Sequence, residues 1–232
     1  FADLTEEKLG ELLIEVREEL KEKGRYRQLL NDPFNKYLFH KLDQTTANVA
    51  HYWHSNVNKT TFRPQYSELS FGKNQKVSGL SYSWKDDNNK KKIVDLRGKM
   101  DRVDLAQVND RVLGEVIDYK SSAKKFDLGL FANGISMQMI SYLEVLKNNN
   151  KFFAQGKDLD VLGAFYQNIT SSLERLSSEK MILSNYQIKD LAKESTKKLI
   201  YNGILIADEE MLDLIEPGME KDRAVSDLYT SV

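Results

Sequence analysis

The sequence has no cysteine among its 232 residues, so it forms neither disulfides nor thiolate metal sites and has no cysteine nucleophile. It also lacks any apolar run near the roughly 20 residues that a membrane-spanning helix requires. No basic segment followed by an apolar core opens the chain, so nothing indicates a secretion signal. These absences fit a reducing compartment, and we expect a cytoplasmic protein.

An excess of one charge is missing too, because the net charge is only −1. This argues against a globally basic nucleic-acid-binding protein. Charge is nevertheless uneven, since the stretch from Lys85 to Lys125 holds 11 Lys and Arg against 8 Asp and Glu. Such an excess fits either an ordinary solvated face or a surface that faces phosphates.

What the chain does contain is enough apolar side chain, 41% of residues, for a sizeable core. Its length predicts one large domain, or one domain with a helical annex. We expect residues 1–60 to form an N-terminal helical segment, 61–170 the core and 171–232 a C-terminal helical elaboration. Because the chain begins with Phe1 and enters a helix almost at once, we expect it to be part of a longer polypeptide.

Helical periodicity predicts two N-terminal helices. The first is capped by Asp3 or Thr5 and stops at Gly24, and the second starts at Asp32-Pro33. Their expected buried stripes are Leu9, Leu12, Leu13, Val16 and Leu20 in the first, and Phe34, Leu38, Leu42, Val49 and Trp53 in the second. Near the C-terminus, one helix is predicted to stop at Gly203 and a short one to begin at Asp208.

Between these helices, runs rich in β-branched and aromatic residues predict strands at 66–71, 79–84, 93–105, 112–120 and 161–169. Turns are predicted at 86–89 and 108–110. Residues 126–147 read as helical, with inward-facing positions at Ile135, Met139, Leu143 and Leu146.

Asp118 and Lys120 stand two residues apart at the end of an apolar strand and therefore point to the same face. Val112 and Val116 precede them on that face, so the strand presents a core that turns polar at its rim. Charges at such a rim avoid the cost of burial in the middle of a sheet.

Asp101 ends a similar run, and a hairpin around Asn109-Asp110 would set it opposite Asp118. Two neighbouring carboxylates repel each other and favour a cation, and their hard oxygens suit Mg²⁺ or Mn²⁺. A metal ion there would activate water and polarise a phosphoryl oxygen, with Lys120 offsetting the developing charge. The pattern therefore predicts phosphodiester hydrolysis, although Asp-x-Lys alone is typical of a surface ion pair.

Further candidates carry weaker signals. Gln138 and Tyr142 lie four apart on one helix edge. This spacing fits either a polar flank of the core or a functional role, in which the two side chains contact the DNA backbone or brace the active site. Glu68 is a candidate third carboxylate or else an edge-strand charge. His51 and His54 share a helix face but have no evident third ligand. No serine–histidine pairing stands out. No Gly-x-x-x-x-Gly-Lys-Ser/Thr loop is present, which argues against ATP hydrolysis by this segment.

Three motifs together resemble the RecB-like branch of the PD-(D/E)XK nuclease superfamily. They are Leu-Arg-Gly-Lys-Met-Asp-Arg-Val-Asp at 96–104, Val-Ile-Asp-Tyr-Lys-Ser-Ser at 116–122 and the Gln-x-x-x-Tyr helix at 138–142. With Gly-Ile-Leu-Ile-Ala-Asp at 203–208, the chain more narrowly resembles the C-terminal nuclease domain of the AddB/RexB family. The likeness covers most of the chain.

The resemblance implies an α/β fold with a PD-(D/E)XK restriction-endonuclease-like core. A central mixed sheet is flanked by helices, with helical N- and C-terminal elaborations. It implies that Asp101, Asp118 and the Tyr119 carbonyl bind Mg²⁺, with Mn²⁺ as a substitute, and that Lys120 is catalytic. Arg102, Gln138 and Tyr142 take DNA-binding or auxiliary roles.

The resemblance also implies a function and its partners: hydrolysis of the 5′-ended strand during double-strand-break resection and recombinational repair, with DNA and a helicase–nuclease subunit of the AddA/RexA type. Two features depart from the family. An upstream helical ligand is not matched, and the cysteines of the usual iron–sulfur cluster are absent, so no cluster is expected in this segment. The alternatives are a non-catalytic DNA-handling or scaffold module of the same fold, and another RecB-like DNA exonuclease.

Overall fold

The computed structural model describes residues 3–122, 124–169, 199, 201–206, 211 and 229–231. They fall into two compact units, one of helices and one built on a β-sheet. The helical unit contains α1 (Glu6–Glu22), α2 (Gly24–Leu29) and α3 (Pro33–Asn56). Within these described ranges, no helix combines the length and the apolar composition needed to cross a bilayer.

The starts of α1 and α3 agree with their sequence signals. Thr5 Oγ1 accepts a hydrogen bond from Lys8 N at 3.2 Å and caps α1. The Asp32 carboxylate accepts one from Asn35 N at 3.0 Å, and Pro33 occupies the first turn of α3. These side chains satisfy amide groups that a helix N-terminus leaves without partners. The short helix α2 was not predicted, because Gly24 opens it directly after α1 ends.

The predicted buried stripes of these helices are only partly correct. Leu9 and Val49 are buried, but Phe34 is 65% exposed and Leu42 66%. Leu38 and Val16 are exposed as well. Periodicity identifies an apolar stripe but not what covers it, so it overstated the burial of α3.

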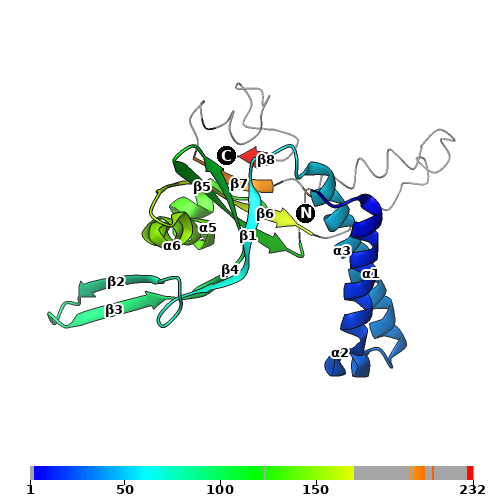
Figure 1. The fold of residues 1–232 in the computed structure, drawn as a ribbon. Coiled ribbons are helices and arrows are strands. Elements are labelled where there is room, and N and C mark those ends of the chain that lie inside the picture. Colours follow the sequence, from blue (N-terminus) through cyan, green and yellow to red (C-terminus); the bar gives the residue numbers. More distant parts are fainter. Residues whose placement is uncertain are drawn as a thin grey trace, which may run out of the picture. The chain divides into compact units, whose positions relative to one another are not determined.

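The second unit holds a six-stranded sheet in the order β1-β4-β5-β6-β7-β8 and a separate two-stranded ribbon, β2-β3 (Figure 1). Its strands are β1 (Arg63–Phe71), β2 (Leu80–Lys85), β3 (Lys91–Leu96), β4 (Gly98–Val108), β5 (Arg111–Lys120), β6 (Asp158–Asn168), β7 (Tyr201–Leu205) and β8 (Tyr229–Ser231). Its helices are α4 (Leu128–Ala132), α5 (Gln138–Asn148) and α6 (Asn150–Ala154). The sheet is mixed, because β7 and β8 are parallel while β1/β4, β4/β5 and β6/β7 are antiparallel.

The single strand predicted at 93–105 is in fact two strands, β3 and β4, which belong to different sheets. They separate at Gly98, where a Cβ atom would approach the Phe71 ring to 2.8 Å. A run of strand-forming residues shows that strands are present, but it does not show where the chain changes its pairing partner.

The C-terminal segment also differs from the prediction. Gly203 was expected to stop a helix, yet it lies in β7, where a Cβ would meet the Ala164 carbonyl oxygen at 2.1 Å. Glycine is needed there because the β6 backbone passes too close for any side chain. Strands β7 and β8 thus lie within the segment 171–232, which the sequence predicts to be mainly helical. The helix predicted before Leu199 and the start at Asp208 lie outside the described residues.

Helix α5 packs on the sheet and completes the core that supports the site. Met139, Leu143 and Leu146 are buried, as predicted, in one cluster with Val103 and Val116 of the central strands. The prediction was wrong for Ile135, which is 71% exposed, because α5 begins only at Gln138. One end of α5 therefore stands beside the last residues of β5, where the predicted polar rim lies.

Candidate active site

A two-residue turn sets the register of the site. Strands β4 and β5 pair from Val108↔Arg111 to Arg102↔Ile117, which leaves Asn109 and Asp110 as the hairpin loop. Asn109 adopts a φ of 54°, a left-handed conformation that asparagine tolerates better than most residues. Continued by one residue, this register sets Asp101 opposite Asp118, and the hydrogen bond from Tyr119 N to Asp101 Oδ2 agrees with the pairing predicted from the sequence.

The Asp118 carboxylate sits at the buried end of β5, only 3% exposed. Its Oδ1 accepts a hydrogen bond from Gln138 Nε2 at 2.7 Å and lies 3.3 Å from the Tyr142 hydroxyl. Its Oδ2 has no hydrogen-bond partner but forms an ion pair with the Lys120 ammonium. The predicted same-face arrangement of Asp118 and Lys120 is therefore confirmed.

Gln138 and Tyr142 form the wall of the site on the α5 side. Gln138 bridges two elements of the site, since its Oε1 accepts from Lys120 Nζ at 3.2 Å while its amide also donates to the Tyr142 hydroxyl at 2.8 Å. The Tyr142 hydroxyl also lies 3.0 Å from the Lys99 carbonyl oxygen of β4. Burial raises the pKa of Tyr142 to about 12, so this hydroxyl keeps its proton. Both side chains thus orient Asp118 and Lys120.

Asp101 is half-buried, and its Oδ2 accepts a hydrogen bond from the Tyr119 backbone N–H at 2.8 Å. Burial raises the pKa of Asp101, and the negative charges of Asp118 and Glu68 raise it further, while the Tyr119 N–H and Lys120 act in the opposite sense. A bound cation would offset the negative charges that raise the pKa of Asp101.

Glu68 occupies a distorted position on β1. Its neighbours Ser67 and Leu69 pair with Arg102 and Met100, so Glu68 faces Asp101 across the ladder. Its φ is 54°, an uncommon conformation for a residue other than glycine, and such strain recurs at functional sites. Its side chain is 62% exposed and pairs with Lys99. It remains a candidate third carboxylate.

Arg102 is buried behind the site rather than displayed on a surface, with 6% exposure. It donates two hydrogen bonds of 2.8 Å to the Asp104 carboxylate, one of 3.1 Å to the Tyr119 hydroxyl and one of 2.6 Å to the Tyr201 hydroxyl. Of the two roles expected for Arg102, this position favours the auxiliary one, because its hydrogen bond to the Tyr119 hydroxyl fixes a side chain of β5 next to Asp118.

Sequence reasoning missed Asp104 and Tyr201, which complete this buried cluster. The signal for Asp104 was available, because Arg102 and Asp104 stand two apart in an otherwise buried strand, and a buried charge requires a partner. No local signal pointed to Tyr201, which comes from β7, 99 residues along the chain from Arg102.

His51 and His54 lie apart from the candidate site residues. His51 Nδ1 and His54 Nδ1 lie 2.8 Å and 3.0 Å from the Glu6 carboxylate of α1, inside the helical unit. Throughout the described part of the chain, three or more histidine, aspartate or glutamate side chains nowhere gather closely enough to hold a metal ion.

The donors at the site fit a hard divalent cation. Asp101 and Asp118 supply carboxylate oxygens from adjacent strands, and the buried Asp118 Oδ2 lacks a hydrogen bond. Mg²⁺ prefers such oxygens and commonly takes only one or two protein carboxylates, with water and substrate phosphate filling its other positions. Two protein carboxylates are therefore enough to hold a Mg²⁺ ion.

Comparison with known proteins agrees with this geometry. The PD-(D/E)XK nuclease superfamily profile matches residues 2–213. Among curated relatives, the chain is 91% identical over 232 residues to the B-type subunit of the ATP-dependent helicase/deoxyribonuclease of Lactobacillus gasseri. It is 51% identical over 235 residues to the Lactobacillus helveticus protein of the same name and 39% identical over 229 residues to that of Lactobacillus delbrueckii subsp. bulgaricus.

These alignments cover 97–100% of this chain but only 19–20% of each relative, so the chain spans about a fifth of their length. PD-(D/E)XK nucleases generally use a divalent metal, in keeping with the oxygen donors found here. The profile match over most of the chain, on a mixed sheet with paired carboxylates at adjacent strand ends, shows that this chain belongs to the PD-(D/E)XK nuclease superfamily.

Proposed function

We propose that this chain is the nuclease domain of an AddB/RexB-like helicase–nuclease subunit, and that it hydrolyses phosphodiester bonds of DNA with Mg²⁺. The observation that carries the proposal is the placement of Asp101 opposite Asp118, with Lys120 beside Asp118. The relatives are named as a helicase/deoxyribonuclease, and this name supports the substrate and the setting.

In this proposal Asp101, Asp118 and the Tyr119 carbonyl hold the ion, and Mn²⁺ substitutes for Mg²⁺. The bound ion supplies a Lewis acid for the phosphoryl oxygen and makes water more acidic. Lys120 offsets the negative charge that develops on the phosphate, and Gln138 holds the Lys120 ammonium at 3.2 Å. The Tyr119 N–H orients Asp101 through its 2.8 Å hydrogen bond.

The wider role in the proposal is exonucleolytic removal of the 5′-ended strand during double-strand-break resection and recombinational repair. The partners are DNA and a helicase–nuclease subunit of the AddA/RexA type, and the location is the cytoplasm. This wider role is proposed for the longer protein rather than for this chain alone, because the chain spans about a fifth of the length of its relatives.

The test uses Asp118→Asn and Lys120→Gln in the complete helicase–nuclease. Because each variant keeps the size of the side chain and removes its charge, we expect cleavage to fall by at least about 100-fold while ATP-driven unwinding persists. Lys125→Gln is the matched control, an exposed lysine outside the site. Wild-type cleavage in both site variants would overturn the proposal.

One observation keeps a second candidate in view, a non-catalytic DNA-handling or scaffold module with this fold. Asp101 and Asp118 are in register, but among the described residues no three acidic or histidine side chains gather closely enough to hold a metal ion. Mn²⁺ titration of the complete protein separates the two candidates. Binding that disappears in an Asp101→Asn/Asp118→Asn variant supports the nuclease, and an unchanged titration supports the scaffold.

A further inference from the structure

The ribbon formed by β2 and β3, residues 80–96, is surrounded by a concentration of positive charge. Residues 72–99 contain eight Lys and Arg against three Asp, a net charge of +5 in a chain whose total is −1. Four of these lysines, Lys85 and Lys90–Lys92, lie next to the turn at the tip of the ribbon. The ribbon extends beyond the end of the six-stranded sheet (Figure 1).

One face of the ribbon is aromatic and apolar. The pairs Tyr82↔Val94 and Trp84↔Lys92 place Tyr82, Trp84 and Val94 on the same face. Tyr82 is 52% exposed, Trp84 50% and Val94 44%. Exposed aromatic side chains flanked by lysines have the composition of surfaces that bind single-stranded nucleic acid.

The base of the ribbon is fixed to the nuclease core. The Asn149 side chain, directly after α5, accepts a hydrogen bond from Ser78 N at 2.8 Å and donates to Ser78 O at 3.1 Å. It also donates to Val145 O of α5 at 2.8 Å. Leu80 and Val77 are buried in the same cluster as the residues beneath the site. The ribbon is therefore held by its base and leaves both faces of its outer part open.

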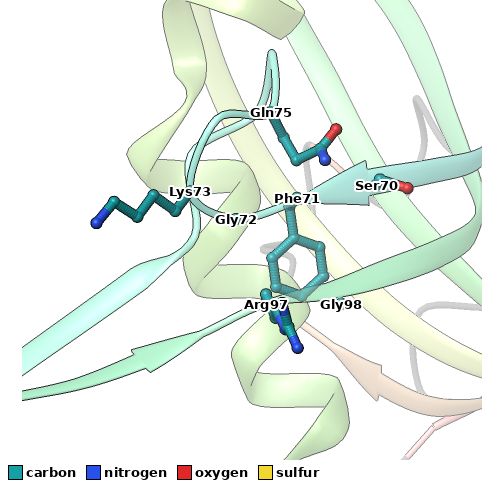
Figure 2. Close-up of a pocket in the computed structure, with 7 residues that line it drawn as sticks. All are labelled: Ser70, Phe71, Gly72, Lys73, Gln75, Arg97 and Gly98. Atoms are coloured by element: carbon teal, nitrogen blue, oxygen red, sulfur yellow. The ribbon is translucent and has the colours of Figure 1, made fainter.

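A cavity of about 360 Å³ lies at the base of the ribbon. Its lining comes from the junctions of β1 and β4 with the ribbon: Ser70, Phe71, Gly72, Lys73, Gln75, Arg97 and Gly98 (Figure 2). The Phe71 ring also packs edge-on against Tyr142, with ring centroids 6.1 Å apart. Lys73, Arg97 and Phe71 make this lining cationic and aromatic, and Gly98 precedes Asp101 by three positions on β4.

We propose that the β2–β3 ribbon is a binding arm for single-stranded DNA, which it presents to the site of Asp101 and Asp118; this rests on the proposed function. Bases stack on Tyr82 and Trp84, and the lysines at the tip neutralise phosphates. A net charge of +5 fits a polyanion better than an apolar protein surface, so we favour DNA over a protein partner.

The test is photo-cross-linking of a thiothymidine-substituted oligothymidylate to the complete helicase–nuclease, in EDTA so that no cleavage is required. We expect cross-links within residues 80–85, identified by mass spectrometry. A Lys90→Gln/Lys91→Gln/Lys92→Gln variant keeps both aromatic rings, so a loss of cross-linking in it reports weaker binding rather than lost photochemistry. For three phosphate contacts, the slope of log affinity against log salt falls by about 2.

Tyr82→Ala/Trp84→Ala tests stacking through the cleavage reaction. We expect its KM for oligothymidylate to rise at least about tenfold with kcat unchanged, because each stacked base contributes appreciable affinity. Ile93→Ala is the matched control, since Ile93 lies on the opposite face of the same ribbon and is 56% exposed.

Two outcomes would contradict the proposal that the ribbon binds DNA. One is the absence of cross-links in the ribbon, with affinity, salt dependence and KM unchanged in every variant. The other is loss of complex assembly in Tyr82→Ala/Trp84→Ala with unchanged KM for the complexes that still form, which identifies a protein interface. Because cross-linking needs no cleavage, failure of the proposed nuclease function leaves this test readable.

Discussion

The β4–β5 and β2–β3 hairpins are neighbours in the chain, yet they use the same backbone pairing for opposite purposes. In β5 the seven residues from 112 to 118 are all buried, and their charged groups are held by specific partners. In β3 all six residues are exposed. Hydrogen-bonded strands alone therefore do not determine function. Packing on both faces buries the first hairpin in the core, and its absence leaves the side chains of the second open to solvent.

The largest expected difference in stability is between Arg102 of β4 and Arg97, which directly follows β3. Arg102→Met leaves the buried Asp104 carboxylate without its two hydrogen bonds, and we expect the free energy of unfolding to fall by about 3–5 kcal/mol. Arg97→Met, in the exposed connection between β3 and β4, is expected to change it by less than about 0.5 kcal/mol. Urea unfolding of the chain measures both.

A double variant sharpens this prediction. Arg102→Met/Asp104→Leu removes both buried charges, and we expect it to recover much of the stability lost in the single variant. Equal stability losses in Arg102→Met and Arg97→Met would show that burial does not distinguish the two hairpins.

A matched pair of valines gives a smaller difference. Val116 of β5 is fully buried, and Val116→Ala is expected to lower the free energy of unfolding by about 2 kcal/mol through lost burial and a new cavity. Val94 of β3 is 44% exposed, so Val94→Ala is expected to cost less than about 0.5 kcal/mol. Thermal or urea unfolding of the two variants, measured side by side, checks the ranking.

The smallest effect is expected at an exposed polar cluster in the helical unit, which contrasts with the buried one around Arg102. Both ring nitrogens of His54 face acceptors, the Leu4 carbonyl at 2.6 Å and the Glu6 carboxylate at 3.0 Å. The hydrogen bond to the Leu4 carbonyl, and to a smaller extent the one to Glu6, raises the pKa of His54 above 6.5. The hydrogen bond from His54, and to a smaller extent the one from His51, lowers the pKa of Glu6 below 4.5.

The two shifts define a pH window for this contact. The His54 contribution is complete below pH 6.5 and is lost as the pH rises through its raised pKa. The Glu6 contribution is present above pH 4.5 and is lost as the pH falls through its lowered pKa. NMR titration of the His54 ring should show its pKa falling in Glu6→Gln but not in the control Glu7→Gln. An unchanged titration in Glu6→Gln would contradict the contact.

The parts of the fold that the sequence predicted are those with local causes. The Asn109-Asp110 turn fixes the register of Asp101 and Asp118, and Asp32-Pro33 starts α3, because short-range geometry decides both. The position of the candidate site could therefore be predicted from one turn and the end of one strand. The roles of its residues, metal binding and catalysis, stay predictions that the experiments above test.

What the sequence did not reveal depends on distant contacts. Gly203 reads as a helix stop until β6 is seen to pass 2.1 Å from where its Cβ would stand. Tyr201 becomes a partner of Arg102 only through the order of strands in the sheet. Ile135 keeps helical spacing but falls in a connection, so its exposure is decided by where α5 begins.

Asn149 has a mechanical consequence. It joins the foot of the β2–β3 arm to the last turn of α5, and the first turn of α5 carries Gln138, which is bonded to Asp118. A helix of 11 residues, about 16 Å long, therefore connects the base of the ribbon to the Asp118 carboxylate. If the ribbon binds DNA as proposed, this helix would keep a constant spacing between the bound strand and the Asp118 carboxylate.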